Sequence, residues 1–107
     1  MNTVIEYLYR DAGNNKVWNE AVINGCLSQE QIDIVCSSLE DGVYFIPRFV
    51  GFPEERFDSY DCELDHAFFE LEPSWIHNED RLPTVSITPQ EVTEAFVNNK
   101  GKWFSLL

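Results

Sequence analysis

The chain has 107 residues, enough for one domain with its own core, and its 44% hydrophobic and 14% aromatic content excludes a disordered acidic tail. Seven bases against nineteen acids give a net charge of −12. This charge excludes DNA, RNA and anionic membranes as direct partners, because binding to phosphates needs clustered lysine and arginine. No apolar stretch approaches the roughly 18 residues of a transmembrane helix.

The first predicted elements are two strands joined by a turn. Residues 3–9 (TVIEYLY) and residues 16–23 (KVWNEAVI) are rich in β-branched and aromatic side chains, which favour strands. Between them, residues 11–15 (DAGNN) contain glycine and asparagine, which tolerate positive φ and favour a turn. We therefore expect an antiparallel pair.

A helix is predicted over residues 29–40. Ser28 and Gln31 have the spacing of a capping box, in which two side chains satisfy free N–H groups of the first turn. Gly42 favours a left-handed end to the helix. The apolar residues at helical spacing, which form one face, are Ile32, Val35, Cys36 and Leu39.

The middle of the chain is predicted to form short strands and loops. Residues 43–46 (VYFI) are typical of a buried strand, which Pro47 ends. Residues 66–72 (HAFFELE) alternate between apolar and polar side chains and predict another strand. Residues 73–83, bounded by two prolines, are interpreted as a loop.

A second helix is predicted to begin after Thr88 and to run to about residue 99. Thr88 is the N-cap, proline follows at the first helical position, and Glu91 completes a capping box. Residues 85–87 are interpreted as a brief strand or an extended lead-in. We expect Trp103, beyond the helix, to pack back on the body of the protein.

The order of these elements predicts a single α+β domain over residues 1–107. We expect an antiparallel sheet of about four to five strands with two helices packed on one face. Three cysteines, an odd count without CxxC spacing, favour reduced thiols. The first residues lack the basic and apolar regions of a signal peptide. Together these features predict a cytoplasmic protein.

The most distinctive feature is an acidic stretch over residues 54–80, which holds ten of the nineteen acids and one base, Arg56. In an extended segment, Asp61, Glu63 and Asp65 share one face with about 6.6 Å between neighbours. Such a row crudely imitates the phosphates of a DNA strand, which advance about 3.4 Å per charge. The alternative is that the acids only increase solubility.

We therefore predict a non-catalytic binding protein whose carboxylates dock on a basic surface of another protein. A nuclease or a DNA-binding protein fits best, with DNA mimicry or antagonism of a host-defence protein or toxin as the means. Aromatic residues between the acids are either interface anchors or core. The predicted partner-binding residues are Glu54, Glu55, Asp58, Asp61, Glu63, Asp65, Glu70 and Glu72.

No catalytic, metal or cofactor site is predicted. Cys62 and His66 lie four apart, but the neighbouring acids raise a thiol pKa rather than lower it. A calcium loop starting at Asp58 fails, since Tyr60 and Cys62 would occupy ligand positions. The histidines lack the spacing of a transition-metal site, and there is no glycine-rich phosphate motif.

Two alternatives stay open. One is a small ligand-binding module or enzyme with a pocket near Arg48, Arg56 and His66, because arginine suits bidentate recognition of a carboxylate or phosphate. In that region the arginines can equally well offset nearby acids. The other is a structural subunit or homodimer that associates through exposed aromatic residues such as Trp18, Tyr44 or Trp103.

Five segments carry a family resemblance: YLYRDAGNNK, GCLSQEQID, DGVYFIPRFVGFPEERF, DHAFFELE and ITPQEVTEAFVNNKGKW. The chain resembles a family of small acidic bacterial proteins, often found on conjugative or phage-like elements. The similarity spans Tyr7 to Trp103, and its sharpest part is FIP-x-x-VG-x-P-x-x-RF. No activity is established for that family. The resemblance implies a mobile-element setting, which favours an antagonist of host defence.

Overall fold

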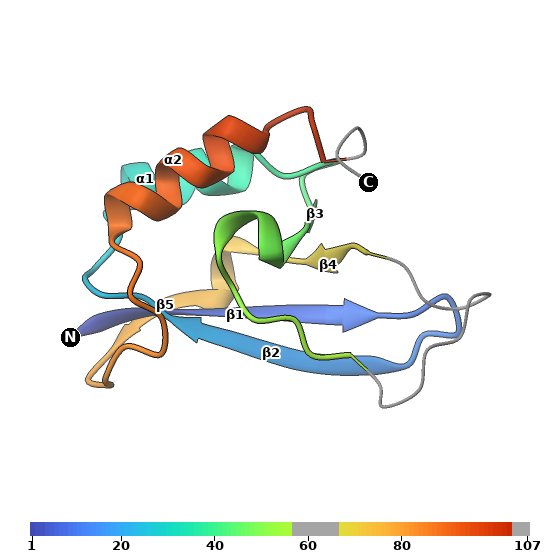
Figure 1. Cartoon of the computed structure of the whole chain (residues 1–107), viewed down its shortest axis with the longest axis horizontal. Helices are drawn as coiled ribbons and strands as arrows, with labels where there is room; N and C mark the ends of the chain where they lie inside the picture. Colours follow the sequence, from blue (N-terminus) through green and yellow to red (C-terminus); the bar gives the residue numbers. More distant parts are fainter. Residues whose placement is uncertain (57–66, 104–107) are drawn as a thin grey trace.

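The fold is a five-stranded antiparallel sheet with two helices covering one face (Figure 1). The structure, a computed structural model, describes residues 1–56 and 67–103. The α+β class and the placement of both helices confirm the prediction. Within the described ranges the elements are β1 (Asn2–Arg10), β2 (Lys16–Val22), α1 (Gln29–Ser37), β3 (Tyr44–Phe45), the 3-10 helix η1 (Pro47–Val50), β4 (Phe69–Glu70), the 3-10 helix η2 (Pro73–Trp75), β5 (Ile76–Glu79) and α2 (Pro89–Asn99).

Strand β1 lies at the centre of the sheet. Along one edge it pairs with β2, in a register that places Glu6 opposite Glu20 and Leu8 opposite Trp18. Along its other edge it pairs with β5 over residues 2–5 and with β4 at Leu8. Strand β3 pairs with β4 and completes the order β2-β1-β4-β3.

Strand β5 corrects the prediction of a loop over residues 73–83. Its sequence, IHNE, contains a single apolar residue and has little intrinsic preference for a strand. It forms because its backbone pairs with the first half of β1, where Ile76 lies opposite Ile5. Pairing within the fold overrides the weak local preference.

Both predicted capping boxes are present. The Ser28 hydroxyl accepts a hydrogen bond from the Gln31 N–H at 3.1 Å, and the Ser28 N–H donates to Gln31 Oε1 at 2.9 Å. Helix α1 nevertheless ends at Ser37, three residues before its predicted end. The chain turns there because Glu40 bridges to Tyr44 at the start of β3, through a turn in which Gly42 has a φ of +74°.

The cap of α2 gives a first testable prediction. Thr88 Oγ1 accepts from the Glu91 N–H at 3.2 Å, and Glu91 Oε1 accepts from the Thr88 N–H at 3.1 Å. Replacing Thr88 with alanine is expected to lower the free energy of unfolding by about 1 kcal/mol. Urea denaturation followed by circular dichroism measures it. Gln90→Ala, an exposed change on the same helix, is the control, and equal losses in the two variants would contradict the prediction.

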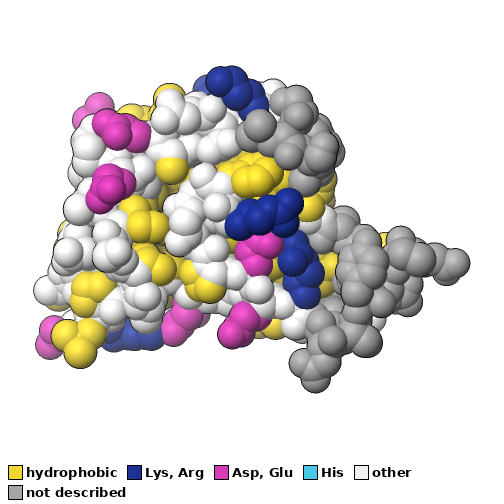
Figure 2. Space-filling view, in the orientation of Figure 1, with side chains coloured by type: hydrophobic (Ala, Val, Ile, Leu, Met, Phe, Trp, Pro, Cys, Tyr) yellow, Lys and Arg dark blue, Asp and Glu magenta, His cyan; other side chains and the backbone are white. Residues whose placement is uncertain are grey.

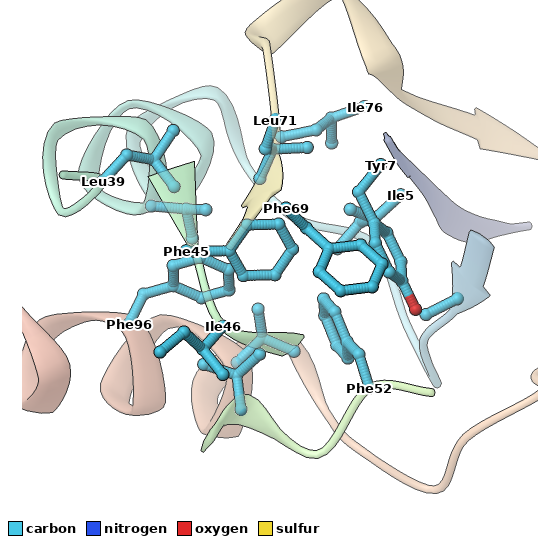
Figure 3. Close-up of a cluster of buried hydrophobic side chains, with 14 of the residues drawn as sticks. Ile5, Tyr7, Leu39, Phe45, Ile46, Phe52, Phe69, Leu71, Ile76 and Phe96 are labelled. Atoms are coloured by element: carbon cyan, nitrogen blue, oxygen red, sulfur yellow. The ribbon is translucent and has the colours of Figure 1, made fainter. Parts of the chain in front are cut away.

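The core is a cluster of buried aliphatic and aromatic side chains between the sheet and the helices (Figure 3). Phe45 lies at its centre, with ring centroids 5.5 Å from Tyr7, 5.4 Å from Phe96 and 6.4 Å from Trp103. Trp103 is fully buried, and its indole N–H donates to the Ser38 carbonyl at 2.9 Å. It packs back on the body as predicted, so it is wrong to count it among the exposed aromatic residues.

The described cysteines, Cys26 and Cys36, are free thiols, whereas Cys62 lies outside the described ranges. Burial, assisted by nearby Asp33, raises the pKa of the Cys36 thiol, which disfavours a reactive thiolate. In residues 1–56 and 67–103, neither helix has the length and apolar character needed to cross a membrane.

Candidate functional site

The structure describes half of the predicted partner-binding residues: Glu54, Glu55, Glu70 and Glu72. The predicted carboxylate row falls within residues 57–66, outside the described ranges, and so do the cysteine–histidine pair and two of the interleaved aromatic residues. The residues concerned are Phe57, Asp58, Tyr60, Asp61, Cys62, Glu63, Asp65 and His66.

Glu54 is an internal counter-ion. Its side chain is only 10% exposed and lies 3.1 Å from Arg56 Nη2 and 3.5 Å from Arg48 Nη1. Its second oxygen accepts a hydrogen bond from the Arg48 backbone N–H at 2.7 Å. One carboxylate therefore ties the start of η1 to the segment that follows it.

The two arginines of the predicted ligand pocket are the partners of Glu54. The Arg56 guanidinium also lies over the rings of Tyr9 and Phe69, at 5.4 Å and 5.2 Å from their centroids. Arg48 lies 5.3 Å from the ring of Phe49. The structure thus shows both arginines offsetting a nearby acid. His66 lies outside the described ranges, so a pocket around the three residues stays a prediction.

Glu70 is also paired within the fold. It lies on β4 next to the end of β1, where Arg10 Nε donates to its Oε2 at 2.8 Å. Its side chain is 17% exposed. Two of the four described candidates, Glu54 and Glu70, therefore have their charge offset by arginines of the same chain.

Glu55 and Glu72 are the described candidates with exposed side chains. The backbone of Glu55 is fixed by Asn19, a buried residue of β2. The Asn19 amide accepts from the Glu55 N–H at 2.6 Å and donates to the Glu55 carbonyl at 3.0 Å. In residues 1–56 and 67–103, no ion-pair partner is seen for Glu55 or Glu72. Among the described residues, no cation therefore offsets these two carboxylates.

Glu55 borders a hollow that we call the β2 hollow, with a volume of about 440 Å³. It lies where β1 and β2 meet the segment that follows η1. Because Glu6 faces Glu20 across the pair and side chains alternate along a strand, Glu6, Trp18 and Glu20 project from the same face. The residues that line the hollow are Glu6, Trp18, Asn19, Glu20, Pro53 and Glu55.

Charges around the β2 hollow are only partly offset. Arg81 donates to both Glu20 oxygens, one at 3.0 Å, and this interaction lowers the pKa of Glu20. His77 Nδ1 lies 3.9 Å from Glu6, while its Nε2 lies 3.0 Å from Glu79. None of the six lining residues carries a positive charge. The hollow is therefore acidic.

Trp18 provides the aromatic wall of the hollow. It is 54% exposed, which confirms the prediction of an exposed aromatic residue on β2. It packs edge-on against Trp75 of η2, with ring centroids 4.8 Å apart, so the tryptophan is held in place by a second ring.

Tyr7 holds the wall formed by Pro53. Its ring is buried, and its hydroxyl donates to the Pro53 carbonyl at 2.5 Å. Burial, with the negative charges of Glu54, Glu55 and Glu20, raises the pKa of Tyr7 above its ordinary value. The phenol therefore stays protonated and works as a structural donor.

This pKa shift predicts a loss of stability in alkali. The unfolded chain releases the Tyr7 proton at a lower pH than the folded protein does. The protonated Tyr7 phenol therefore makes its full contribution to the free energy of unfolding below about pH 10. Above that pH the contribution is lost, by up to about 1.4 kcal/mol per pH unit. Between pH 8 and 11, urea denaturation should show a larger loss for the wild type than for Tyr7→Phe. Equal losses in both proteins would contradict the assignment.

The surface shows no single acidic patch among the described atoms of the face in Figure 2. Acidic side chains are scattered over this face, and several basic side chains lie beside one of them. In residues 1–56 and 67–103, no group of three or more histidine, cysteine, aspartate or glutamate side chains is arranged to hold a metal ion.

Comparison with protein-family models, curated proteins and solved structures finds no match. The family resemblance described above therefore stays a prediction.

The β2 hollow was not predicted from the sequence. Its two strands were predicted, and a correct register for the turn between them would have placed Glu6 opposite Glu20. The approach of Pro53 and Glu55 to β2 depends on contacts more than 30 residues apart in the chain, such as the Asn19–Glu55 hydrogen bonds. No local pattern indicates such contacts.

Proposed function

We propose that this protein is a non-catalytic, cytoplasmic binding protein that uses exposed carboxylates to dock on a basic surface of another protein. The observation that carries the proposal is that the protein's own arginines are already paired with carboxylates. All four arginines lie in the described ranges, and each forms an ion pair with a carboxylate of the same chain. Arginines already paired in this way offer little to an acidic ligand.

The acids outnumber these cations. The described ranges contain fifteen acids against seven bases, and residues 57–66 add four more acids and no lysine or arginine. The resulting field attracts basic surfaces and speeds encounter with them, while it repels nucleic acids. A nuclease or DNA-binding protein, whose own surface is built to meet phosphates, matches this field best. DNA mimicry, or antagonism of a host-defence protein or toxin, is the corresponding role.

The experiment is a search for the partner followed by competition. Immobilised protein is exposed to bacterial lysate at low salt, and proteins released by a salt gradient are identified and purified. For each one, calorimetry measures affinity at two salt concentrations, with and without duplex DNA. We expect a partner whose affinity falls steeply with salt and which DNA displaces. The proposal would be overturned if none of the captured proteins binds in a salt-sensitive way and is displaced by DNA.

Variants then test which carboxylates are used. Asp61, Glu63 and Asp65 are changed together to asparagine and serine, and Glu55→Gln and Glu72→Gln are made separately. Loss of binding in the triple variant with the fold intact supports docking through the acidic stretch. Wild-type affinity in all three variants would contradict the predicted binding residues.

A further inference from the structure

We propose that the β2 hollow receives an arginine side chain of the basic partner, which makes this hollow the specific contact within a broader charged interface. The inference rests on the proposed function for the nature of the partner. The inference goes beyond the proposed function by naming one chemical group of the partner and the place on this protein that binds this group.

The shape of the hollow suits a side chain. Its volume of about 440 Å³ lies within the roughly 300–1,000 Å³ of ligand sites in proteins. It is bordered by Trp18, which is exposed beside it, and by carboxylates from two separate parts of the chain, Glu6 on β1 and Glu55 after η1. A guanidinium entering between them can meet an aromatic ring and a carboxylate together.

The charge of the hollow selects a cation. Glu20 is already paired with Arg81, so Glu6 and Glu55 carry the charge that is left for a ligand. Glu6 is 45% exposed at its side chain and has only the long 3.9 Å approach of His77. An anionic or apolar ligand would leave these carboxylates without compensation, which is costly when they are covered.

The protein's own arginines show the same combination of groups. Arg56 pairs with Glu54 and lies over the rings of Tyr9 and Phe69. Arg48 also pairs with Glu54 and lies over Phe49. The β2 hollow presents these two kinds of group, a carboxylate and an aromatic ring, to a molecule from outside.

The walls of the hollow are fixed before a ligand arrives. Asn19 holds the backbone of Glu55 by two hydrogen bonds, the Tyr7 hydroxyl holds Pro53, and Trp75 packs against Trp18. Binding to walls that are already ordered costs less conformational entropy. Arginine is favoured over lysine because its planar guanidinium both stacks on an aromatic ring and pairs with a carboxylate.

The first test uses the purified chain and a blocked Gly-Arg-Gly peptide. Titration is followed by NMR at the tryptophan indole N–H signals, with the matching lysine and citrulline peptides as comparisons. We expect the Trp18 signal to shift most with arginine, less with lysine and little with citrulline, which lacks the charge. Equal shifts with all three peptides, or no shift of Trp18, would overturn the inference.

Variants of the walls complete the test. Glu55→Gln and Trp18→Leu are each expected to weaken the binding of the arginine peptide by about threefold. Leucine at position 18 keeps an apolar side chain against Trp75. Glu94→Gln removes the same charge from an exposed position on α2, which neither lines the hollow nor belongs to the predicted partner-binding residues, and this variant is expected to bind the peptide normally. Circular dichroism and thermal unfolding confirm that each variant is folded.

The two proposals fail in different ways. If a basic partner binds, but Glu55→Gln and Trp18→Leu bind it as tightly as the wild type and Glu94→Gln do, the hollow is not the arginine site and the proposed function stands. If no basic partner is found, the proposed function fails. The peptide titration then decides by itself whether the hollow binds a guanidinium.

Discussion

Replacing Trp103 with alanine is expected to lower the free energy of unfolding by about 3–5 kcal/mol, because it removes a fully buried ring from the core. The indole touches Phe45 and Phe96, whose ring centroids lie 6.4 Å and 6.0 Å away. The change also leaves the Ser38 carbonyl without its donor. A domain of this size has about 5–15 kcal/mol of stability in total, so the variant should be close to unfolding.

Urea denaturation of three variants separates the contributions. Trp103→Phe retains a ring and loses the hydrogen bond, and it should cost about 1–3 kcal/mol. Trp18→Ala removes the same type of side chain from a half-exposed position and should cost clearly less than Trp103→Ala. Similar losses at positions 18 and 103 would contradict the placement of Trp103 in the core.

Replacing Glu54 with glutamine is expected to lower the free energy of unfolding by about 2 kcal/mol, the scale of a charged hydrogen bond in a covered position. The substitution keeps the shape of the side chain and removes its charge. Arg48 and Arg56 then lose their shared counter-ion, and the Arg48 N–H loses a charged acceptor. The segment between η1 and residue 56 should loosen.

Glu55→Gln is the matched control, because it makes the same chemical change at the next residue, where the side chain is exposed. We expect its stability to be near that of the wild type and its binding of arginine peptide to be weakened. Glu54→Gln should lose clearly more stability than Glu55→Gln. Hydrogen exchange at residues 48–56 reports the loosening, and unchanged exchange and stability in Glu54→Gln would show that the ion pairs contribute nothing.

The elements that could be predicted are those specified by neighbouring residues. The capping boxes at Ser28 and Thr88 involve residues three apart, so their spacing in the sequence is already their spacing in space. Strand β1 is rich in β-branched and aromatic residues, which favour a strand and are visible in the sequence.

The elements that could not be predicted depend on distant contacts. Strand β5 has a polar sequence and exists because β1 offers an edge to it. Glu70 is paired with Arg10, 60 residues earlier in the chain. Glu54 binds two arginines within six residues of it, but an irregular segment around a proline has no periodicity that would indicate which side chains meet.

The candidate site divides in the same way. The excess of acidic charge was accessible from composition. The exposure of Trp18 was predicted together with that of Trp103, which is buried, so the sequence did not distinguish the two. The separation of acids into internal counter-ions and free carboxylates could not be predicted from the sequence, because it depends on where the four arginines lie in the fold. Composition shows how many charges a chain has, and the fold decides which of them are available to a partner.

The central position of β1 also affects how the chain folds during synthesis. Its pairing with β2 joins neighbouring segments and can form early, as a hairpin. Its other edge pairs with β4 and β5, which follow only at residues 69–79. Until they emerge from the ribosome, one edge of the hairpin and the apolar face carrying Ile5 and Tyr7 lack their partners. The nascent protein thus passes through an interval in which aggregation is most favoured, because exposed strand edges and apolar faces associate with one another.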